Sequence, residues 1–379
     1  MLVAPLATVL ALAGCGGQDR KQPQFVEAPA GAGATASSPS TTSSADPSSP
    51  TTPKPTATVK LLPRPGNPNG HASVPAEARA IDTSKPDHVI GTGMPASCTS
   101  AAVVKAVAAG GIITFNCGPA PTTITMTATA KVRNTTGSRV VIDGGNRVTL
   151  SGGGKRRILY QNTCDAALGI TNSHCQDQAT PRLVVQNLAF AGGNSTGQTA
   201  EGGGGGAIFV RGGRLLVTNS RFSGNRCDRT GPDLGGAAIR VLSQYHNLPV
   251  YVVHSTFTGG SCSNGGALSS IGVSWTVLNS VFRDNEAIGN GANPARSGTP
   301  GGGSGGAIYN DGNTFTLSLA GSLIEDNHAK EGGGAVFFVS NDRTGTLDLR
   351  GATLKHNPSA GFETQGLPGI FFLGKSVRR

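Results

Sequence analysis

Three polar side chains recur at one position of an internal repeat and are the first candidates for chemistry in this chain. Asp284, Asp326 and His356 each lie two residues after an apolar residue that recurs along the C-terminal half. If the repeats stack, these side chains form one column. Such a column can bind a divalent cation such as Ca²⁺, the one cofactor considered, or act as a general acid and base. The competing interpretation is a solvated turn, because Asp before Asn is common turn chemistry.

A second column follows the glycine pairs of the repeat. Phe209, Arg240, Tyr309 and Phe337 each come directly after an aliphatic residue. If the aliphatic residue points inward, the next residue points outward. Aromatic rings and a guanidinium on one exposed face can stack on sugar rings or contact a partner protein. The alternative is that long loops, such as residues 285–304, cover this ligand stripe.

These candidates are positioned by two short patterns that alternate along the chain. Gly-Gly-Ala-Ile occurs at 205–208 and 305–308, and Asn-Ser-x-Phe-x-x-Asn occurs at 219–225 and 279–285. A unit of about 30 residues with short apolar strands and glycine-rich turns indicates a solenoid. Apolar residues stand five and seven positions before each recurring anchor, which indicates strands with one buried face. The anchors are Phe190, Phe222, Phe257, Phe282, Ile324 and Leu354.

The sequence therefore predicts an all-β fold, a right-handed parallel β-helix of about nine or ten coils over residues 88–379. The unequal spacing of the anchors disfavours a closed propeller. An Ala- and Val-rich run at 101–109 predicts one short helix. Thr99 or Ser100 can cap its first turn and Gly110 can end it. This helix is expected to cover the N-terminal end of the solenoid.

The cysteines provide a test of the predicted register. Six remain when Cys15 is set aside, and two of these lie five residues after successive anchors. Stacked coils bring those two to one position on neighbouring layers, at a distance that suits a disulfide. Proximity along the chain suggests two further pairs, although fifteen connectivities are formally open. The expected pairs are Cys227–Cys262, Cys98–Cys117 and Cys164–Cys175.

The N-terminal part has the composition of a leader and a spacer. An apolar run ends in Leu12-Ala13-Gly14-Cys15, which resembles a bacterial lipobox and implies cleavage before a lipid-bearing Cys15. Residues 1–15 are thus expected to be a lipoprotein signal, with attachment to a membrane through Cys15; a chance cysteine in a plain secretion signal is the alternative. Residues 16–87 are rich in Ser, Thr and Pro and are expected to form a disordered linker.

The alternation of Gly-Gly-Ala-Ile with Phe-x-x-Asn resembles the polymorphic outer membrane protein repeat and, more broadly, the β-helices of the pectate-lyase-like superfamily. The resemblance covers about residues 183–372. It implies an exported protein, a surface adhesin in many members of that repeat family. Members of that name end in a membrane β-barrel, whereas only one more strand and a basic tail are expected here. Attachment to the membrane would then depend on the lipid-bearing Cys15.

Charge favours an anionic partner over other classes. The formal net charge is +10, which favours an acidic glycan or cell-wall polymer. The basic cluster at 155–157 suits a solvated turn, and no nucleic-acid partner is expected. The leading hypothesis is an exported, lipid-anchored cell-surface module that is adhesive or binds a glycan or partner. The alternative is a polysaccharide lyase or glycoside hydrolase acting on an acidic polysaccharide, which leaves catalytic activity open; the third is a structural spacer without ligand.

Overall fold

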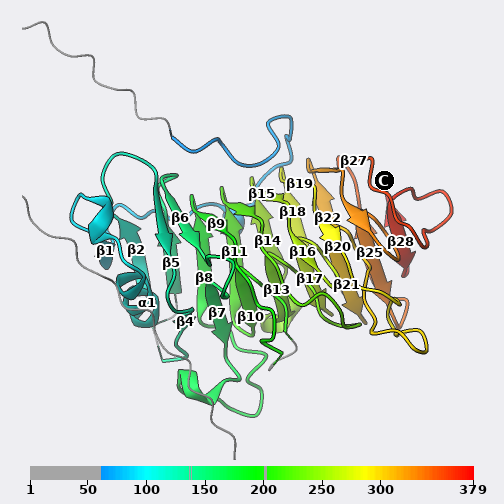
Figure 1. The fold of residues 1–379 in the computed structure, drawn as a ribbon, viewed down its shortest axis with the longest axis horizontal. Helices are drawn as coiled ribbons and strands as arrows, with labels where there is room; N and C mark the ends of the chain where they lie inside the picture. The colour runs from blue at the N-terminus through cyan, green and yellow to red at the C-terminus, as the bar shows by residue number, and fades with distance from the viewer. Residues whose placement is uncertain (1–60, 136, 138, 200–202) are drawn as a thin grey trace, which may run out of the picture. The chain divides into compact units, whose positions relative to one another are not determined.

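The fold was described from a computed structural model, which describes residues 61–135, 137, 139–199 and 203–379. Residues 57–379 belong to one compact unit. Short parallel strands wind through this unit as a parallel β-helix (Figure 1). The expected signal, Cys15 and the linker up to residue 60 lie outside the described residues.

Each complete coil contributes one strand to each of three parallel sheets, which we call the first, second and third sheets. The chain passes from the first sheet to the third and then to the second. The first sheet contains β1 (His88–Ile90), β2 (Gly111–Phe115), β5 (Arg139–Asp143), β8 (Arg182–Gln186), β11 (Arg214–Thr218), β14 (Val250–Val253), β18 (Trp275–Leu278), β22 (Thr316–Ala320), β26 (Thr346–Asp348) and β29 (Ser376–Arg378). Its ten strands agree with the nine or ten coils expected from the repeats.

The second and third sheets have eight strands each, and a small fourth sheet extends one corner. The second sheet contains β4 (Ala130–Val132), β7 (Leu159–Asn162), β10 (Ile208–Arg211), β13 (Ile239–Ser243), β17 (Leu268–Ile271), β21 (Ile308–Gly312), β25 (Val336–Ser340) and β28 (Ile370–Leu373). The third contains β3 (Thr122–Thr125), β6 (Val148–Ser151), β9 (Ala189–Ala191), β12 (Arg221–Ser223), β15 (Thr256–Thr258), β19 (Val281–Arg283), β23 (Leu323–Glu325) and β27 (Thr353–Lys355). The fourth contains β16 (Ser261–Cys262), β20 (Glu286–Ala287) and β24 (His328–Ala329).

The recurring anchors stack in register inside the β-helix. The ring centroids of Phe190 and Phe222 lie 5.0 Å apart, those of Phe222 and Phe257 4.6 Å, and those of Phe257 and Phe282 4.8 Å. All four side chains are buried. The register predicted from the repeat is therefore confirmed, because strand pairing alone places equivalent residues about 4.8 Å apart.

A serine corner separates the first sheet from the third. Residues such as Asn219 and Asn279 adopt φ of 49° and 53° and turn the chain. A buried serine follows each. The backbone N–H of Ser220 donates to Ser255 Oγ at 3.2 Å, and the N–H of Ser255 donates to Ser280 Oγ at 3.1 Å. The hydroxyls thus satisfy the corner backbone that strand pairing leaves free.

The helix expected at the N-terminal end is α1 (Ser100–Ala109). Thr99 is its N-cap and accepts a hydrogen bond from the N–H of Ala102 at 3.2 Å, and Gly110 ends it with φ of 80°. Val103 and Val107 are fully buried against the core of the first coils. Figure 1 shows α1 at that end of the strands. The cap predicted from sequence is therefore present.

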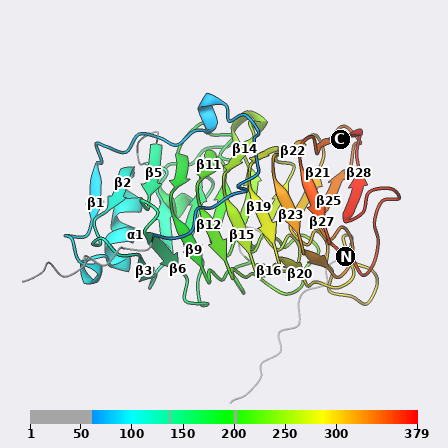
Figure 2. The same cartoon turned by 90° about the horizontal axis from the view of Figure 1, so that it is seen from above.

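Residues 66–87, which we call the strap, correct the expected linker boundary at residue 87. The strap runs across the strands of the first sheet (Figure 2). Two of its residues form paired hydrogen bonds with side-chain amides of the first sheet. The backbone of Ala72 bonds to Asn279 and that of Ile81 to Gln186, at 2.8–2.9 Å. The strap contains the 3₁₀ turn η1 (Ala76–Ala78) and covers an apolar column on the outer face of the sheet. That column consists of Ile112, Val141, Val184 and Leu216 in register, together with Val253 and Leu278 two residues further along their strands.

Other short turns and the cysteine pairs complete the described unit. The three pairs at disulfide distance are the three expected from the sequence, with Cα–Cα distances of 5.7, 4.9 and 4.8 Å for Cys98–Cys117, Cys164–Cys175 and Cys227–Cys262. None of the helices in the described ranges has the length and apolar character to span a membrane. The remaining 3₁₀ turns are η2 (Pro95–Ser97), η3 (Ala166–Leu168) and η5 (Tyr245–Asn247).

Candidate functional site

The column of Asp284, Asp326 and His356 forms as a stack, but its members are turn residues in solvent. Pairing of Arg283 with Glu325 sets the stack of the two aspartates. The three residues adopt φ of 56°, 55° and 47°. The side chain of His356 is 88% exposed and that of Asp326 51%, with His356 Nδ1 3.8 Å from Asp326 Oδ1. Screening by water leaves such a pair little strength, so the geometry matches the solvated-turn interpretation.

Divalent-cation binding by this column finds no support among the described residues. Within 61–135, 137, 139–199 and 203–379, no group of three or more His, Cys, Asp or Glu side chains is arranged to hold a metal ion. The neighbouring carboxylate of Glu325 is instead engaged by the guanidinium of Arg283. The column therefore supplies neither an enclosed acid–base pair nor a cation cage.

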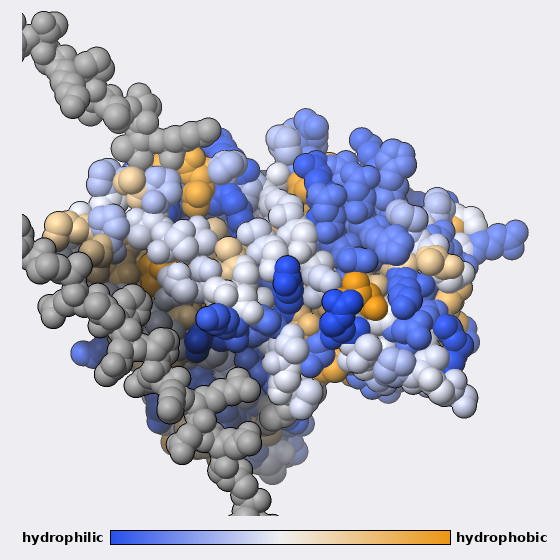
Figure 3. Space-filling view, in the orientation of Figure 1, coloured by the Kyte–Doolittle hydropathy of each residue, from blue (hydrophilic) through white to orange (hydrophobic). Residues whose placement is uncertain are grey.

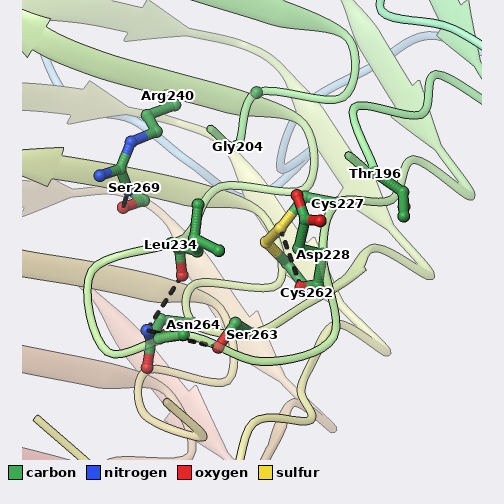
Figure 4. Close-up of a disulfide and its surroundings, with 12 residues drawn as sticks. Thr196, Gly204, Cys227, Asp228, Leu234, Arg240, Cys262, Ser263, Asn264 and Ser269 are labelled. Atoms are coloured by element: carbon green, nitrogen blue, oxygen red, sulfur yellow. Dashed lines mark hydrogen bonds between the residues drawn. A yellow bond between two sulfur atoms is a disulfide. The ribbon is translucent and has the colours of Figure 1, made fainter. Parts of the chain in front are cut away.

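The ligand stripe was expected to be exposed, and that expectation is wrong. Phe209, Arg240, Tyr309 and Phe337 are all at most 1% exposed. They do point away from the core of the β-helix, but loops cover them, which was the alternative weighed from the sequence. Figure 4 shows Arg240 beside Ser269, with the loop that carries Leu234 nearby. In this conformation the four side chains form a second buried layer and offer no surface to a ligand.

Two contacts show how the long loop holds its place over the stripe. The side-chain amide nitrogen of Asn293 lies 2.7 Å from Tyr309 Oη and 2.9 Å from Asp311 Oδ2. Arg296 forms a bidentate pair with the buried Glu331, with both N–O distances at 2.7 Å. These two side-chain contacts therefore hold residues 288–303 over the stripe.

Arg240 of the stripe is buried and hydrogen-bonded. Burial is the first cause that lowers the pKa of Arg240 to about 10, and Arg240 Nη1 donates to Ser269 Oγ at 3.0 Å.

An open groove lies instead beside the start of the first sheet. It has a volume of about 790 Å³ and is bounded on one side by Asp87, His88 and the end of α1. Gly111 lets the side chain of Asp87 approach the start of β2, because a Cβ at that position would lie 2.5 Å from Asp87 Oδ2. Arginines at the starts of three successive strands of the first sheet also line the groove. These are Arg139, Arg182 and Arg214.

The three arginines form a column because each is the first residue of its strand. Arg139 on β5 pairs with Arg182 on β8, and Arg182 pairs with Arg214 on β11. We call these three residues the arginine column. Among the described residues, none of the three forms an ion pair with a carboxylate; Arg182 Nη2 donates to the backbone carbonyl of Glu77 at 2.8 Å. Adjacent like charges on a sheet destabilise it, so the column is a concentrated positive charge with few partners.

The electrostatics of the groove agree with this geometry. Partial burial is the first cause that lowers the pKa of Arg182, and the neighbouring charges of Arg214 and Arg139 lower it further. The one carboxylate on the groove wall, that of Asp87, accepts a hydrogen bond from the N–H of Ile112 at 2.7 Å. An anion that entered the groove would lower the mutual repulsion of the guanidiniums, which remain charged at neutral pH.

Sequence reasoning missed the arginine column, although the repeat contained a signal for it. Arg182 and Arg214 directly precede Leu183 and Leu215, which the alignment had already placed at one position. The apolar positions were compared between repeats, whereas the residue before them was not. Arg139 could be added only with the structure, because the coil that contains it lacks the clear repeat pattern.

Comparison with known proteins gives no assignment for this chain. No family model matches it, no curated protein matches it, and no solved structure matches it. The fold assignment therefore rests on the strand pairing, and the functional proposal rests on the groove.

Proposed function

We propose that this is an exported protein whose β-helix unit binds an acidic polysaccharide, through the arginine column in the groove. The observation that carries the proposal is the stack of Arg139, Arg182 and Arg214 along an open groove, where none of them forms an ion pair with a carboxylate of the described residues. The carboxylate of Asp87 on the groove wall is hydrogen-bonded to the backbone of Ile112, so an anionic ligand would supply the charge that the three guanidiniums lack.

The geometry of the column favours a polymer over a single small anion. Strands of one sheet repeat about every 4.8 Å along the β-helix, so the three guanidiniums form a row with a regular period. A chain that carries a carboxylate or sulfate on successive units can engage several of them together. Guanidinium binds such groups through two parallel hydrogen bonds. Linked contacts of this kind raise the affinity well above that of one contact.

The surface and the cysteines are consistent with a polar ligand outside the cytoplasm. The face seen in Figure 3 is largely hydrophilic, with small separate apolar patches, whereas protein-binding faces often carry larger continuous ones. Three disulfides indicate an oxidising, exported environment. Attachment through a lipid on Cys15, display at the cell surface and an adhesive role belong to the proposal, as does kinship with the polymorphic outer membrane protein repeat and the pectate-lyase-like superfamily.

The test is the binding of a defined oligouronate to the exported, disulfide-bonded protein, measured by calorimetry at low and at physiological salt. Arg182→Ala should weaken binding about ten-fold, since one bidentate charged contact is lost. Arg229→Ala removes the same charge from an exposed position outside the groove and should leave the affinity within about two-fold, because exposed charges that are distant from a ligand are screened by salt.

Three outcomes contradict the proposal. Equal losses for Arg182→Ala and Arg229→Ala would show that net charge, and not the groove, attracts the glycan. Tight binding of polyphosphate or nucleic acid with no binding of oligouronate would assign the column to another ligand. No binding of any polyanion would favour the structural spacer.

A further inference from the structure

Two stacked aromatic rings lie in the coil that follows the arginine column. The first sheet places β14 next to β11, and the chain enters β14 through the 3₁₀ turn η5. Tyr245 and His246 of this turn stack with their ring centroids 3.9 Å apart and their planes inclined by 18°. The side chain of His246 is 63% exposed, and Tyr245 is half-buried beneath it. These two residues, which we call the aromatic pair, therefore present a ring surface to solvent.

Backbone hydrogen bonds attach η5 to the start of β11 on both sides of the last arginine of the column. The N–H of Tyr245 donates to the carbonyl of Gly213 at 3.1 Å. One residue earlier, the buried Gln244 accepts at Oε1 from the N–H of Leu215 at 3.0 Å. Gly213 and Leu215 are the two chain neighbours of Arg214. The aromatic pair is therefore fixed next to the end of the groove that Arg214 lines.

A second attachment comes from the loop that also lines the groove. Asp177 Oδ1 accepts from the backbone N–H of His246 at 2.6 Å, and Asp177 Oδ2 lies 3.7 Å from His246 Nε2. Residues 179–180, two positions further along, line the groove. The same short segment thus borders the groove and orients the imidazole, so a ligand along the arginine column meets the aromatic pair where the column ends.

We propose that the aromatic pair packs against the sugar ring of the unit whose carboxylate is bound by Arg214. This inference rests on the proposed function and names the part of the ligand that the arginines do not recognise. A guanidinium binds carboxylate and phosphate groups alike. The C–H edges of a sugar ring carry partial positive charge, which suits the negative face of an aromatic ring. The site therefore selects a uronate polymer over a polyanion that has no rings.

The experiment compares His246→Asn with His328→Asn in the exported, disulfide-bonded protein. Asn tolerates the φ of 48° at position 246 and keeps a polar side chain beside Asp177. Affinity for a three-unit oligouronate should fall about five-fold, because an aromatic contact is lost. Affinity for tripolyphosphate, which has charge but no ring, should change less than about two-fold. His328 forms a similar exposed pair with Glu286, at 4.0 Å in the fourth sheet, and His328→Asn should change neither affinity.

Variants of Tyr245 separate the ring from its polar group. Tyr245→Phe keeps the stack and should bind as the unmodified protein does, whereas Tyr245→Leu should lose affinity for the oligouronate alone. Proton NMR of the bound oligouronate supplies a second readout. Its ring C–H signals should shift upfield with the unmodified protein and with Tyr245→Phe, and should not shift with His246→Asn.

The outcomes distinguish this inference from the proposed function. Suppose that oligouronate binding depends on Arg182, but His246→Asn and Tyr245→Leu weaken the oligouronate and tripolyphosphate equally, or weaken neither. That result would overturn the aromatic contact and leave the proposed function intact. Absence of Arg182-dependent binding of the oligouronate would overturn the two together.

Discussion

At the scale of single residues, asparagines that lie three positions after the anchors link neighbouring coils through side-chain hydrogen bonds. These corner asparagines include Asn285, Asn327 and Asn357. Asn327 is fully buried. Its Oδ1 accepts from the backbone N–H and the side-chain amide of Asn285, and its Nδ2 donates to the carbonyl of Phe282 and to Asn357 Oδ1, at 2.8–3.1 Å. Asn327 thus joins its own coil to both neighbours. The repeated Asn of the sequence pattern is explained by this ladder and needs no catalytic role.

We predict that Asn327→Ala lowers the free energy of unfolding by about 2–4 kcal/mol, because several buried polar groups lose their partners. The matched control is Asp326→Asn, one residue earlier in the exposed column. Asn tolerates the positive φ of that position, so the change should stay within about 0.5 kcal/mol. Urea denaturation followed by circular dichroism measures both. A larger loss for Asp326→Asn than for Asn327→Ala would contradict this account of the corner.

At the scale of elements, one ion pair contributes to the position of the loop over the ligand stripe. Arg296 donates two hydrogen bonds to Glu331, and the backbone N–H of Gly291 donates a third at 2.8 Å. The hydrogen bonds from Arg296 are the first cause that lowers the pKa of Glu331 from its ordinary value of 4.5. A carboxylate with a lowered folded pKa stabilises the fold above its unfolded pKa, and this contribution is lost as pH falls through the folded pKa.

Residues 288–303 should therefore stay protected from neutral pH down to the ordinary pKa of 4.5, and lose protection progressively below it, as the pH falls through the lowered pKa of Glu331. Hydrogen exchange, corrected for the intrinsic effect of pH, measures this opening. Arg296→Gln should loosen the loop already at neutral pH and weaken its pH dependence. Arg350→Gln breaks a similar pair with Asp348 in another turn and should not affect the loop. A loop that is equally protected at about pH 2 and pH 7, although Glu331 is protonated at the lower pH, would refute the prediction.

Strands, anchors, cysteine pairs and the helical cap could be predicted because each leaves a periodic or local signal. Residues such as Phe222 and Phe257 recur at aligned positions, so the buried stack follows from the pattern alone. The strap could not be predicted, because Ala78 and Ile81 are isolated apolar residues in a stretch of Pro, Ser and Asp. Their burial depends on an apolar column on the outer face of the first sheet, which becomes visible only when the coils are assembled.

At the scale of the whole molecule, the β-helix turns residues that are distant in sequence into neighbours. Arg139 and Arg214 belong to one column although they stand 75 positions apart in the chain. The same stacking placed Asp284 beside Asp326, but at a tight turn in solvent. Periodicity identified the aspartate stack, whereas the arginine stack was missed. Periodicity could not show which stack borders a groove, because the groove is formed by α1, the two glycines after it and the strand starts together.

The ligand stripe shows that strand periodicity also cannot determine whether an outward-pointing side chain is exposed. The alternation of side chains along a strand correctly predicts that Tyr309 points away from the core. The side chain is nevertheless buried. Whether an outward residue meets solvent is decided by loops such as 288–303, whose path depends on the contacts of Asn293 and Arg296. These contacts join segments that no local pattern relates.

The most direct test of the central claim is the affinity of the protein for oligouronates of increasing length. A row of three arginines predicts that affinity rises at each step from one to three uronate units and changes little beyond that, because further units find no guanidinium in the column. Arg182→Ala, which interrupts the row in the middle, should remove most of the gain between one and three units. Equal affinity for one and three units, or the same length dependence in Arg182→Ala, would contradict the assignment of the arginine column as the binding site.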